Sequence, residues 1–182
     1  NFLKSAGMLT AAAALINPAQ IFAQKGVKKS GGSKKMELSF VAYDAQMKHA
    51  FAIATSVRTT TPIVLTQITY DGVTGYGEAA MPPYLGETQA SVIEFLKKVD
   101  LSKFSSPFLI EDIMNYVDSI AINNTAGKAA VGIALHDLVG KLIGQPWWKI
   151  WGFDPTTCPN TSFTVGLDTE EVVKMKTREA SP

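Results

Sequence analysis

Hydrophobic and polar residues alternate along three segments in the first half of the chain, which is the pattern of β-strands. Met36–Met47 alternates between two sets of side chains, and Pro62–Tyr70 is rich in β-branched residues. Asp71 and Gly72 follow, and both tolerate the positive φ that a two-residue hairpin turn requires. Val73–Ala79 then returns antiparallel to the strand before it. Together these segments predict a three-stranded antiparallel meander.

Apolar residues at helical spacing predict three helices after the meander. The first two cover Glu87–Val99, with Thr88 as its N-cap, and Phe108–Ala121. The third, Thr125–Ile143, is rich in small residues and apolar on most sides, so we expect it to be buried. Gly144 is placed to end this helix.

The end of the chain reads as one further strand and helix. Asn160–Leu167 has the composition of a strand, and Asp168–Glu171 can cap a helix that begins near Val172. A lone βα unit cannot bury a parallel strand on both faces. We therefore expect that the sheet or barrel to which this unit belongs lies outside the chain.

Two glycines in the predicted third strand suggest that another element of the fold packs closely against it. The pattern around them does not indicate a nucleotide site. Gly75 and Gly77 are two residues apart and so lie on one face of the strand, where another element can come close. The surrounding G-x-x-G-x-G pattern differs in spacing from the dinucleotide fingerprint, and it sits inside a hairpin.

The N-terminal residues have the features of an export signal. Ala6–Ile16 is too short to span a bilayer but fits the apolar region of a signal peptide, and Ala23 offers a small residue at a cleavage point. Asn1–Lys4 is similar to the end of a twin-arginine signal, without its arginines. The alternative is an amphipathic first helix, which the polar segment that follows leaves with nothing to pack on. We expect residues 1–23 to be an export signal whose start is missing, and the protein to be periplasmic.

Composition and charge exclude several classes of protein. The chain has 182 residues, of which 46% are hydrophobic and 18% charged, unlike a disordered chain. Cys158 is the single cysteine, so no disulfide scaffold is possible. Six lysines precede the first acidic residue, Glu37, and the 11 basic and 16 acidic residues after them give a mildly acidic body. Such a body argues against a nucleic-acid partner. Residues 24–35 read as a flexible basic linker, with phosphate contact as the alternative. No second apolar run could span a membrane.

Few residues stand out as candidates for chemistry. His49 and His136 are too far apart to suggest a local metal site, and His136 beside Asp137 is expected to form a packed, hydrogen-bonded pair. Arg58–Pro62 is predicted to be a polar loop whose planar guanidinium suits a carboxylate, with a merely solvated loop as the alternative. Ala79–Gly86 is a long apolar connection that we expect to cover something.

Three sequence elements together resemble a known family. They are DGVTGYGEA at 71–79, ALHDLVGKLIGQPWWKIWG at 134–152 and TSFTVGLDT at 161–169. The chain from residue 36 to 180 resembles the N-terminal part of the enolase superfamily, muconate-lactonizing subgroup, with the dipeptide epimerases as the nearest type. The resemblance implies an α+β capping domain at 36–155, a three-stranded antiparallel meander followed by helices. This domain leads into the first βα unit, at 156–182, of a truncated modified TIM barrel.

The resemblance also implies a mechanism whose central groups lie outside this chain. Family members abstract the proton α to a carboxylate with two lysines, and Mg²⁺ held by three acidic residues stabilises the enediolate. The Lys-x-Lys motif and the metal ligands are expected beyond Pro182. Lys174 and Lys176 are expected on a helix and are not candidates. No catalytic or metal-binding residue is therefore expected in the chain, and these 182 residues alone are expected to be inactive.

The resemblance places the substrate-binding residues, unlike the catalytic ones, within this chain. In the family two capping-domain loops close over the barrel, and they correspond to Arg58–Pro62 and Ala79–Glu87. The implied substrate-binding residues are Arg58, Thr59, Thr60, Tyr84 and Thr164. The implied ligand is a small dipeptide, and the intact protein is a possible homo-oligomer. The alternatives are another α-proton abstractor (a cycloisomerase, an o-succinylbenzoate synthase or an acid-sugar dehydratase) and a non-catalytic α+β binding module.

Overall fold

The computed structural model describes residues 17–27, 34–160 and 162–181. Residues 1–16 of the predicted leader, residues 28–33 of the predicted basic linker and Thr161 lie outside the described residues. No helix in the described part of the chain is long and apolar enough to cross a membrane.

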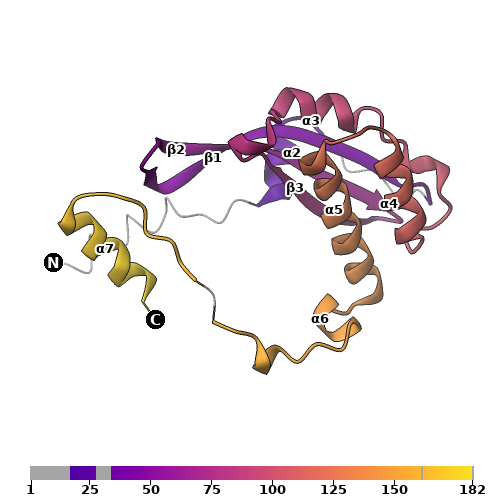
Figure 1. Cartoon of the computed structure of the whole chain (residues 1–182). Helices are drawn as coiled ribbons and strands as arrows, with labels where there is room; N and C mark the ends of the chain where they lie inside the picture. The colour runs from indigo at the N-terminus through magenta and orange to yellow at the C-terminus, as the bar shows by residue number, and fades with distance from the viewer. Residues whose placement is uncertain (1–16, 28–33, 161, 182) are drawn as a thin grey trace.

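A three-stranded antiparallel sheet confirms the predicted meander (Figure 1). Its strands are β1 (Glu37–Ile53), β2 (Ser56–Tyr70) and β3 (Val73–Ala80), in the order β1-β2-β3. The turn between β2 and β3 is the predicted one, because Asp71 has φ 48° and Gly72 has φ 77°.

The first two strands are longer than predicted and project beyond the third. β3 pairs with β2 only over Ile63–Tyr70, so the rest of β2 pairs with β1 alone. We call this two-stranded part, residues 44–62, the hairpin extension. The prediction that Arg58–Pro62 forms a loop is wrong, since these residues continue β2. The threonines at 59–61 are β-branched, and their polarity masked the strand propensity that they share with valine.

The register of the hairpin extension is interrupted once. Gln46 lies opposite Thr60, but the next pair is Phe51 opposite Arg58. Four residues of β1, 47–50, therefore face a single residue of β2. Such bulges bend a strand and redirect its side chains, and they are frequent beside functional sites.

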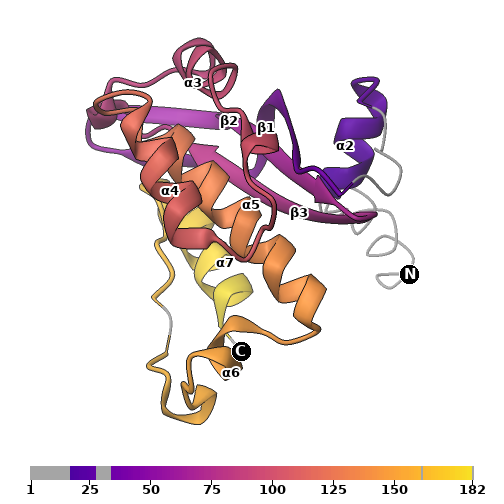
Figure 2. The ribbon, with the colours of Figure 1, turned by 90° about the vertical axis from the view of Figure 1, so that its right-hand side faces the viewer.

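Three helices pack on one face of the sheet (Figures 1 and 2). They are α3 (Gln89–Leu96), α4 (Ile110–Ser119) and α5 (Thr125–Ile143). Thr88 caps α3 as predicted, in a reciprocal pair of hydrogen bonds with Ser91. The shorter helices are α6 (Trp147–Ile150) and the 3-10 turns Pro83–Leu85, Leu101–Lys103 and Pro155–Thr157.

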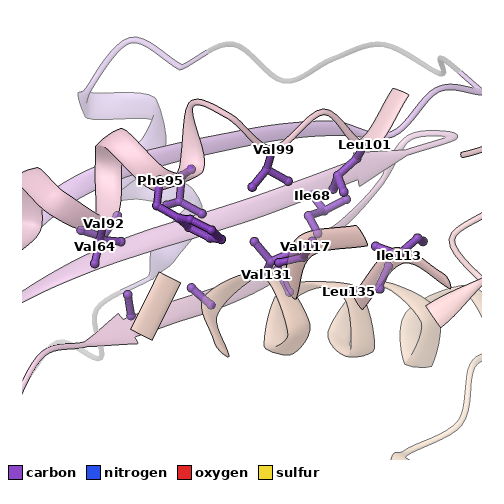
Figure 3. Packing of buried hydrophobic residues seen from close by; sticks show 14 of the residues in the cluster. Val64, Ile68, Val92, Phe95, Val99, Leu101, Ile113, Val117, Val131 and Leu135 are labelled. Carbon is purple, nitrogen blue, oxygen red and sulfur yellow. The ribbon is translucent and has the colours of Figure 1, made fainter. Parts of the chain in front are cut away.

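The main core lies between the sheet and these helices. Val64 and Ile68 of β2 point at the helices and meet Phe95 of α3 and Val131 and Leu135 of α5 (Figure 3). All five are almost inaccessible to solvent. This core carries the hydrophobic stabilisation of the domain and fixes α5 against β2 and β3.

The predicted close approach to the two strand glycines is confirmed. A Cβ atom on Gly75 would lie 2.2 Å from the carbonyl oxygen of Ala134, and one on Gly77 would lie 2.1 Å from that of Ala130. Gly144, with φ 65°, ends α5 at the predicted place. α5 is buried along the side that faces the sheet and the other helices, as expected, while Ile133 on its other side is 51% exposed.

A further helix lies on the opposite face of the sheet. α2 (Pro18–Gln24) carries two buried residues, Ile21 and Phe22. They pack against Val41, Ile63 and Leu65, whose side chains alternate with those of the main core. The sheet is therefore covered on both faces over part of its length (Figure 2).

The end of the described chain contains the predicted helix without the predicted strand. α7 (Glu170–Ala180) begins close to the expected position and carries Lys174 and Lys176, also as expected. Residues 162–168 form no strand, so the prediction of a strand at Asn160–Leu167 is wrong for its described residues. A parallel strand requires neighbours to hydrogen-bond with. This segment has one such contact to the sheet, from the Leu167 amide to the Ala52 carbonyl oxygen at 2.8 Å.

Candidate functional site

A cavity of about 440 Å³ lies where the hairpin extension meets residues 163–166 and α7. Its apolar walls include Phe51 and Phe163, and its lining also contains Thr164. Four titratable residues complete it, namely Lys48, His49, Lys176 and Glu179. The cavity has the size of a small-molecule site and the usual mixture of aromatic walls and a few polar groups.

The bulge in β1 supplies one side of this cavity. Lys48 Nζ lies 2.7 Å and His49 Nε2 lies 2.8 Å from the same atom, Glu179 Oε2 of α7. These hydrogen bonds hold the pKa of the Glu179 carboxyl below its usual value. The contacts join the hairpin extension to α7. Sequence analysis missed them, because a bulge leaves no distinct signal in the hydrophobic pattern.

A buried lysine forms a second link across the cavity. Lys176 Nζ donates to Asp168 Oδ2 at 3.0 Å and to the carbonyl oxygen of Ala50 at 3.2 Å. Its side chain is only 7% exposed, and its hydrogen bond lowers the pKa of the Asp168 carboxyl. Through these two acceptors Lys176 joins α7 to Asp168 and to the hairpin extension.

Of the predicted site residues, Thr164 lines this cavity and Arg58 lies beside one of its wall residues. Arg58 lies opposite Phe51 in the sheet register, and its guanidinium carbon is 5.4 Å from the centre of the Phe51 ring. Phe51 and Thr164 both line the cavity. Within the described residues no carboxylate lies at ion-pair distance from Arg58. The Arg58 guanidinium is thus held against the Phe51 ring and remains available to an anionic ligand.

The other predicted site residues are further apart. Alternation along β2 puts Thr60 on the same face as Arg58 and Thr59 on the opposite face. Tyr84 follows the end of β3, and β3 ends opposite Ile63, at the base of the hairpin extension. Five strand residues, roughly 17 Å, separate this level from Arg58. Tyr84 is 85% exposed, whereas Ala79, at the start of the same connection, is buried in the main core and Met81 packs against that core.

Glu87 holds the connection that contains Tyr84, a role that the sequence did not suggest. Its carboxylate accepts hydrogen bonds from the Thr125 hydroxyl at 2.9 Å and from the Ala126 amide at 3.3 Å. These donors belong to the first turn of α5, where backbone N–H groups lack partners and favour a negative charge. The end of the Ala79–Glu87 connection is thereby fixed to the longest helix.

His136 and Asp137 do not form the predicted pair with each other. His136 Nδ1 lies 2.7 Å from the carbonyl oxygen of Gly132, and its ring packs against Trp147. Asp137 Oδ2 instead accepts from the Tyr76 amide at 2.8 Å and from Lys141. Adjacent residues on a helix point in different directions, so each finds its own partner. Asp137 thus links α5 to β3, whereas His136 packs α5 against Trp147.

The described residues contain no group of three His, Cys, Asp or Glu side chains that could hold a metal ion. The described cavity offers aromatic walls and the hydroxyl of Thr164. The Arg58 guanidinium lies beside it, against the ring of Phe51.

Comparison with known sequences assigns residues 35–152 to the N-terminal domain of mandelate racemase / muconate lactonizing enzymes. This match covers the sheet and helices α3 to α6. It agrees with the α+β capping domain expected from the sequence.

Two of the similar proteins are epimerases. The chain is 57% identical over 155 residues to an L-Ala-D/L-Glu epimerase of Bacteroides thetaiotaomicron, covering 85% of this chain and 40% of that protein. It is 33% identical over 148 residues to an L-Ala-D/L-amino acid epimerase of Maribacter, covering 78% of this chain and 42% of that protein. The chain thus spans about 40% of the length of these curated relatives.

A solved structure shares the fold. The dipeptide epimerase of Enterococcus faecalis, in complex with Mg and L-Leu-L-Tyr, superposes with a TM-score of 0.66 at 29% identity. The superposition covers 80% of this chain and 42% of that protein.

Proposed function

This chain belongs to the mandelate racemase / muconate lactonizing enzyme family, and from that membership we propose that the intact protein is a dipeptide epimerase acting on L-Ala-D/L-Glu. The observation that carries the proposal is the 57% identity to an epimerase of that substrate class over 85% of this chain. The chain supplies the capping domain, whose task is to recognise the substrate.

Arg58 is the residue that we expect to bind an acidic dipeptide. Its guanidinium lies against the Phe51 ring, at the cavity that Thr164 lines. A guanidinium can donate two parallel hydrogen bonds to a carboxylate, which fixes the orientation of the ligand as well as its position. Thr164 offers a hydroxyl on the far wall, and Thr60 shares the face of Arg58. Thr59 faces the other side of β2 and Tyr84 lies at the base of the hairpin extension, so we propose no contact of either with a ligand at this cavity.

The reaction itself requires groups that the described residues do not supply. Inverting an α-carbon requires that a proton leave one face and return to the other. A bound Mg²⁺, as in the Enterococcus faecalis complex, would offset charge that develops on the carboxylate oxygens. Since no metal-binding group is present among the described residues, neither the metal nor the proton transfer is assigned to them.

A proton-exchange experiment tests the proposed activity directly. The intact reading frame, extended past both ends of this chain, is incubated with Mg²⁺ and L-Ala-L-Glu in D₂O and followed by NMR. We expect the α-proton signal of the glutamate residue to disappear while the L,D diastereomer accumulates. If no dipeptide in a panel exchanges its α-proton, the epimerase assignment is wrong and the family membership stands.

The protein is also proposed to be exported, through a twin-arginine-type leader. The supporting features are the apolar stretch Ala6–Ile16 and the preceding Asn1–Lys4 segment. Fractionation of a bacterial host that expresses the intact reading frame with its own leader tests this, and recovery in the cytoplasmic fraction alone would contradict it.

A further inference from the structure

The segment that contains the expected leader cleavage point is built into the folded domain. We propose that residues 17–27, including α2, are a permanent cover of the outer sheet face, and that processing of the leader leaves them attached. The part of this proposal that concerns processing rests on the proposed export. The structural part, that α2 belongs to the fold, does not depend on export or on the enzymatic activity.

The apolar side of α2 is buried against the sheet. Phe22 is 2% exposed and Ile21 is 6% exposed, values found in the main core. The Phe22 ring lies 6.3 Å from the ring of Tyr76 on β3, measured between ring centres. The remaining contacts come from residues on the outer face of β1 and β2, namely Val41, Ile63 and Leu65. Two buried anchors of this size hold a short helix that could not persist alone.

Both ends of the segment are closed by specific hydrogen bonds. At the start, the Asn17 side chain accepts from the Ala19 amide at 3.0 Å, as an N-cap does. At the end, the Val27 amide donates to the Phe22 carbonyl oxygen at 3.0 Å and the Gly26 amide donates to that of Ala23, also at 3.0 Å. Gly26 has φ 75°, the left-handed conformation that ends a helix. The folded unit therefore runs from Asn17 to Val27, and the bond after Ala23 lies inside it.

The geometry at this bond is unfavourable for a leader peptidase. Such enzymes read small residues at two alternate positions before the cut. For a cut after Ala23 these positions are Ala23 and Ile21, and Ile21 is large and buried. The Lys25 amide donates to the Ile21 carbonyl oxygen at 3.0 Å, so the bond is also enclosed in a helical turn. A twin-arginine route delivers a folded protein, and cleavage there would require α2 to unwind first.

Loss of α2 would also damage the surface left behind. A cut after Ala23 removes both anchors and uncovers the apolar residues Val41, Ile63 and Leu65 on one sheet face. A contiguous apolar patch of this kind favours self-association. A cut before Asn17 leaves the patch covered.

The first test is the N-terminus of the mature protein. The intact reading frame with its own leader is expressed in an exporting bacterium, and the purified protein is examined by intact mass and N-terminal sequencing. We expect it to begin at or before Asn17, so that Phe22 is retained. An uncut leader also retains α2 and agrees with the proposal. A mature protein that begins at Gln24 would overturn it.

The second test asks whether α2 is docked at all, and uses two variants of the intact protein. Phe22→Ser removes a buried anchor, while Gln20→Ser changes an exposed position of the same helix to the same residue. We expect Phe22→Ser to lower the midpoint of thermal unfolding by a few degrees and to make residues 18–24 exchange their amide protons rapidly. Gln20→Ser should match the wild type. If both variants melt and exchange like the wild type, α2 is not part of the fold, whatever the enzymatic activity proves to be.

Discussion

At the scale of single residues, Arg58 gives the sharpest test of substrate recognition. Arg58→Ala removes a bidentate partner for a carboxylate, and a hydrogen bond to a charged group contributes about 1.5–3 kcal/mol. We expect KM for L-Ala-L-Glu to rise by about tenfold to a hundredfold, since 1.4 kcal/mol corresponds to a factor of ten. Thermal stability should change little, because Arg58 is exposed.

The control for this prediction is a second exposed arginine. Arg178 lies in the last turn of α7 and is not one of the predicted substrate contacts, so Arg178→Ala should leave the steady-state kinetics unchanged. Equal effects of the two substitutions, or none from either, would show that Arg58 is not a substrate contact.

Tyr76 provides a prediction about pH. Burial, and to a lesser extent the neighbouring Asp137 carboxylate, raise the pKa of the Tyr76 phenol above its ordinary value of 10.0. The folded state therefore holds this proton more tightly than the unfolded state does. The resulting stability is fully present below pH 10 and is lost as pH rises through the raised pKa.

The Tyr76→Phe variant should lack this alkaline loss. The phenylalanine ring still packs on Phe22, so we expect unfolding free energies near those of the wild type at neutral pH. As pH rises above 10, the wild type should lose stability that the variant keeps. Tyr84→Phe, at an exposed position, should behave like the wild type. Parallel pH profiles for Tyr76→Phe and the wild type would contradict the raised pKa.

At the scale of elements, the contact between α5 and β3 depends on the absence of side chains. A Cβ on Gly77 would meet a helix carbonyl oxygen at 2.1 Å, which only a shift of the helix backbone could relieve. We expect Gly77→Ala to lower the free energy of unfolding by about 1–3 kcal/mol or more, measured in urea. Gly132→Ala is the matched control, because the new Cβ meets only the flexible end of Met114 at 3.3 Å. That helical substitution should be neutral or stabilising.

Several of the helices, strands and turns are determined by local sequence. The hydrophobic pattern, the Asp71-Gly72 turn and the Thr88 cap each act within a few residues, and all three were predictable. The hairpin extension was not predicted, because the part of β2 within it contains the three threonines at 59–61. Polarity alone indicates a loop for such residues. The prediction of a strand near Thr164 was wrong for the described residues. A strand forms only beside neighbouring strands, and the hydrophobic pattern of one segment does not show whether such neighbours exist.

At the scale of the whole molecule, the candidate site could be predicted as a set of residues and not as an arrangement. Arg58 and Thr164 come from distant segments; Thr164 lines the cavity, and Arg58 lies against Phe51, one of its wall residues. Tyr84 was assigned to the same site and lies at the other end of the hairpin extension. The bulge that brings Lys48 and His49 to Glu179 depends on long-range packing between β1 and α7, for which the sequence offers no local signal.

The outer side of α5 bears on how this chain behaves by itself. Ile133, Trp151 and Phe153 are all more than half exposed, and Ile133 and Trp151 line one hollow with His136 and Trp147. An exposed apolar patch promotes association. We therefore expect the 182-residue chain, produced alone, to self-associate and to bind a hydrophobic dye such as ANS.

Two substitutions distinguish the effect of this exposed surface on association from an effect of the core on folding. Ile133→Glu places a charge on the exposed side of α5, whereas Leu135→Glu places the same charge at a residue that is fully buried. We expect Ile133→Glu to reduce association and dye binding, measured by light scattering and fluorescence, without loss of helical circular dichroism. Leu135→Glu should abolish folding, since a buried carboxylate without a partner is costly. If Ile133→Glu associates as strongly as the unmodified chain, a different surface mediates self-association. The outer face of the sheet, next to α2, is then the next candidate.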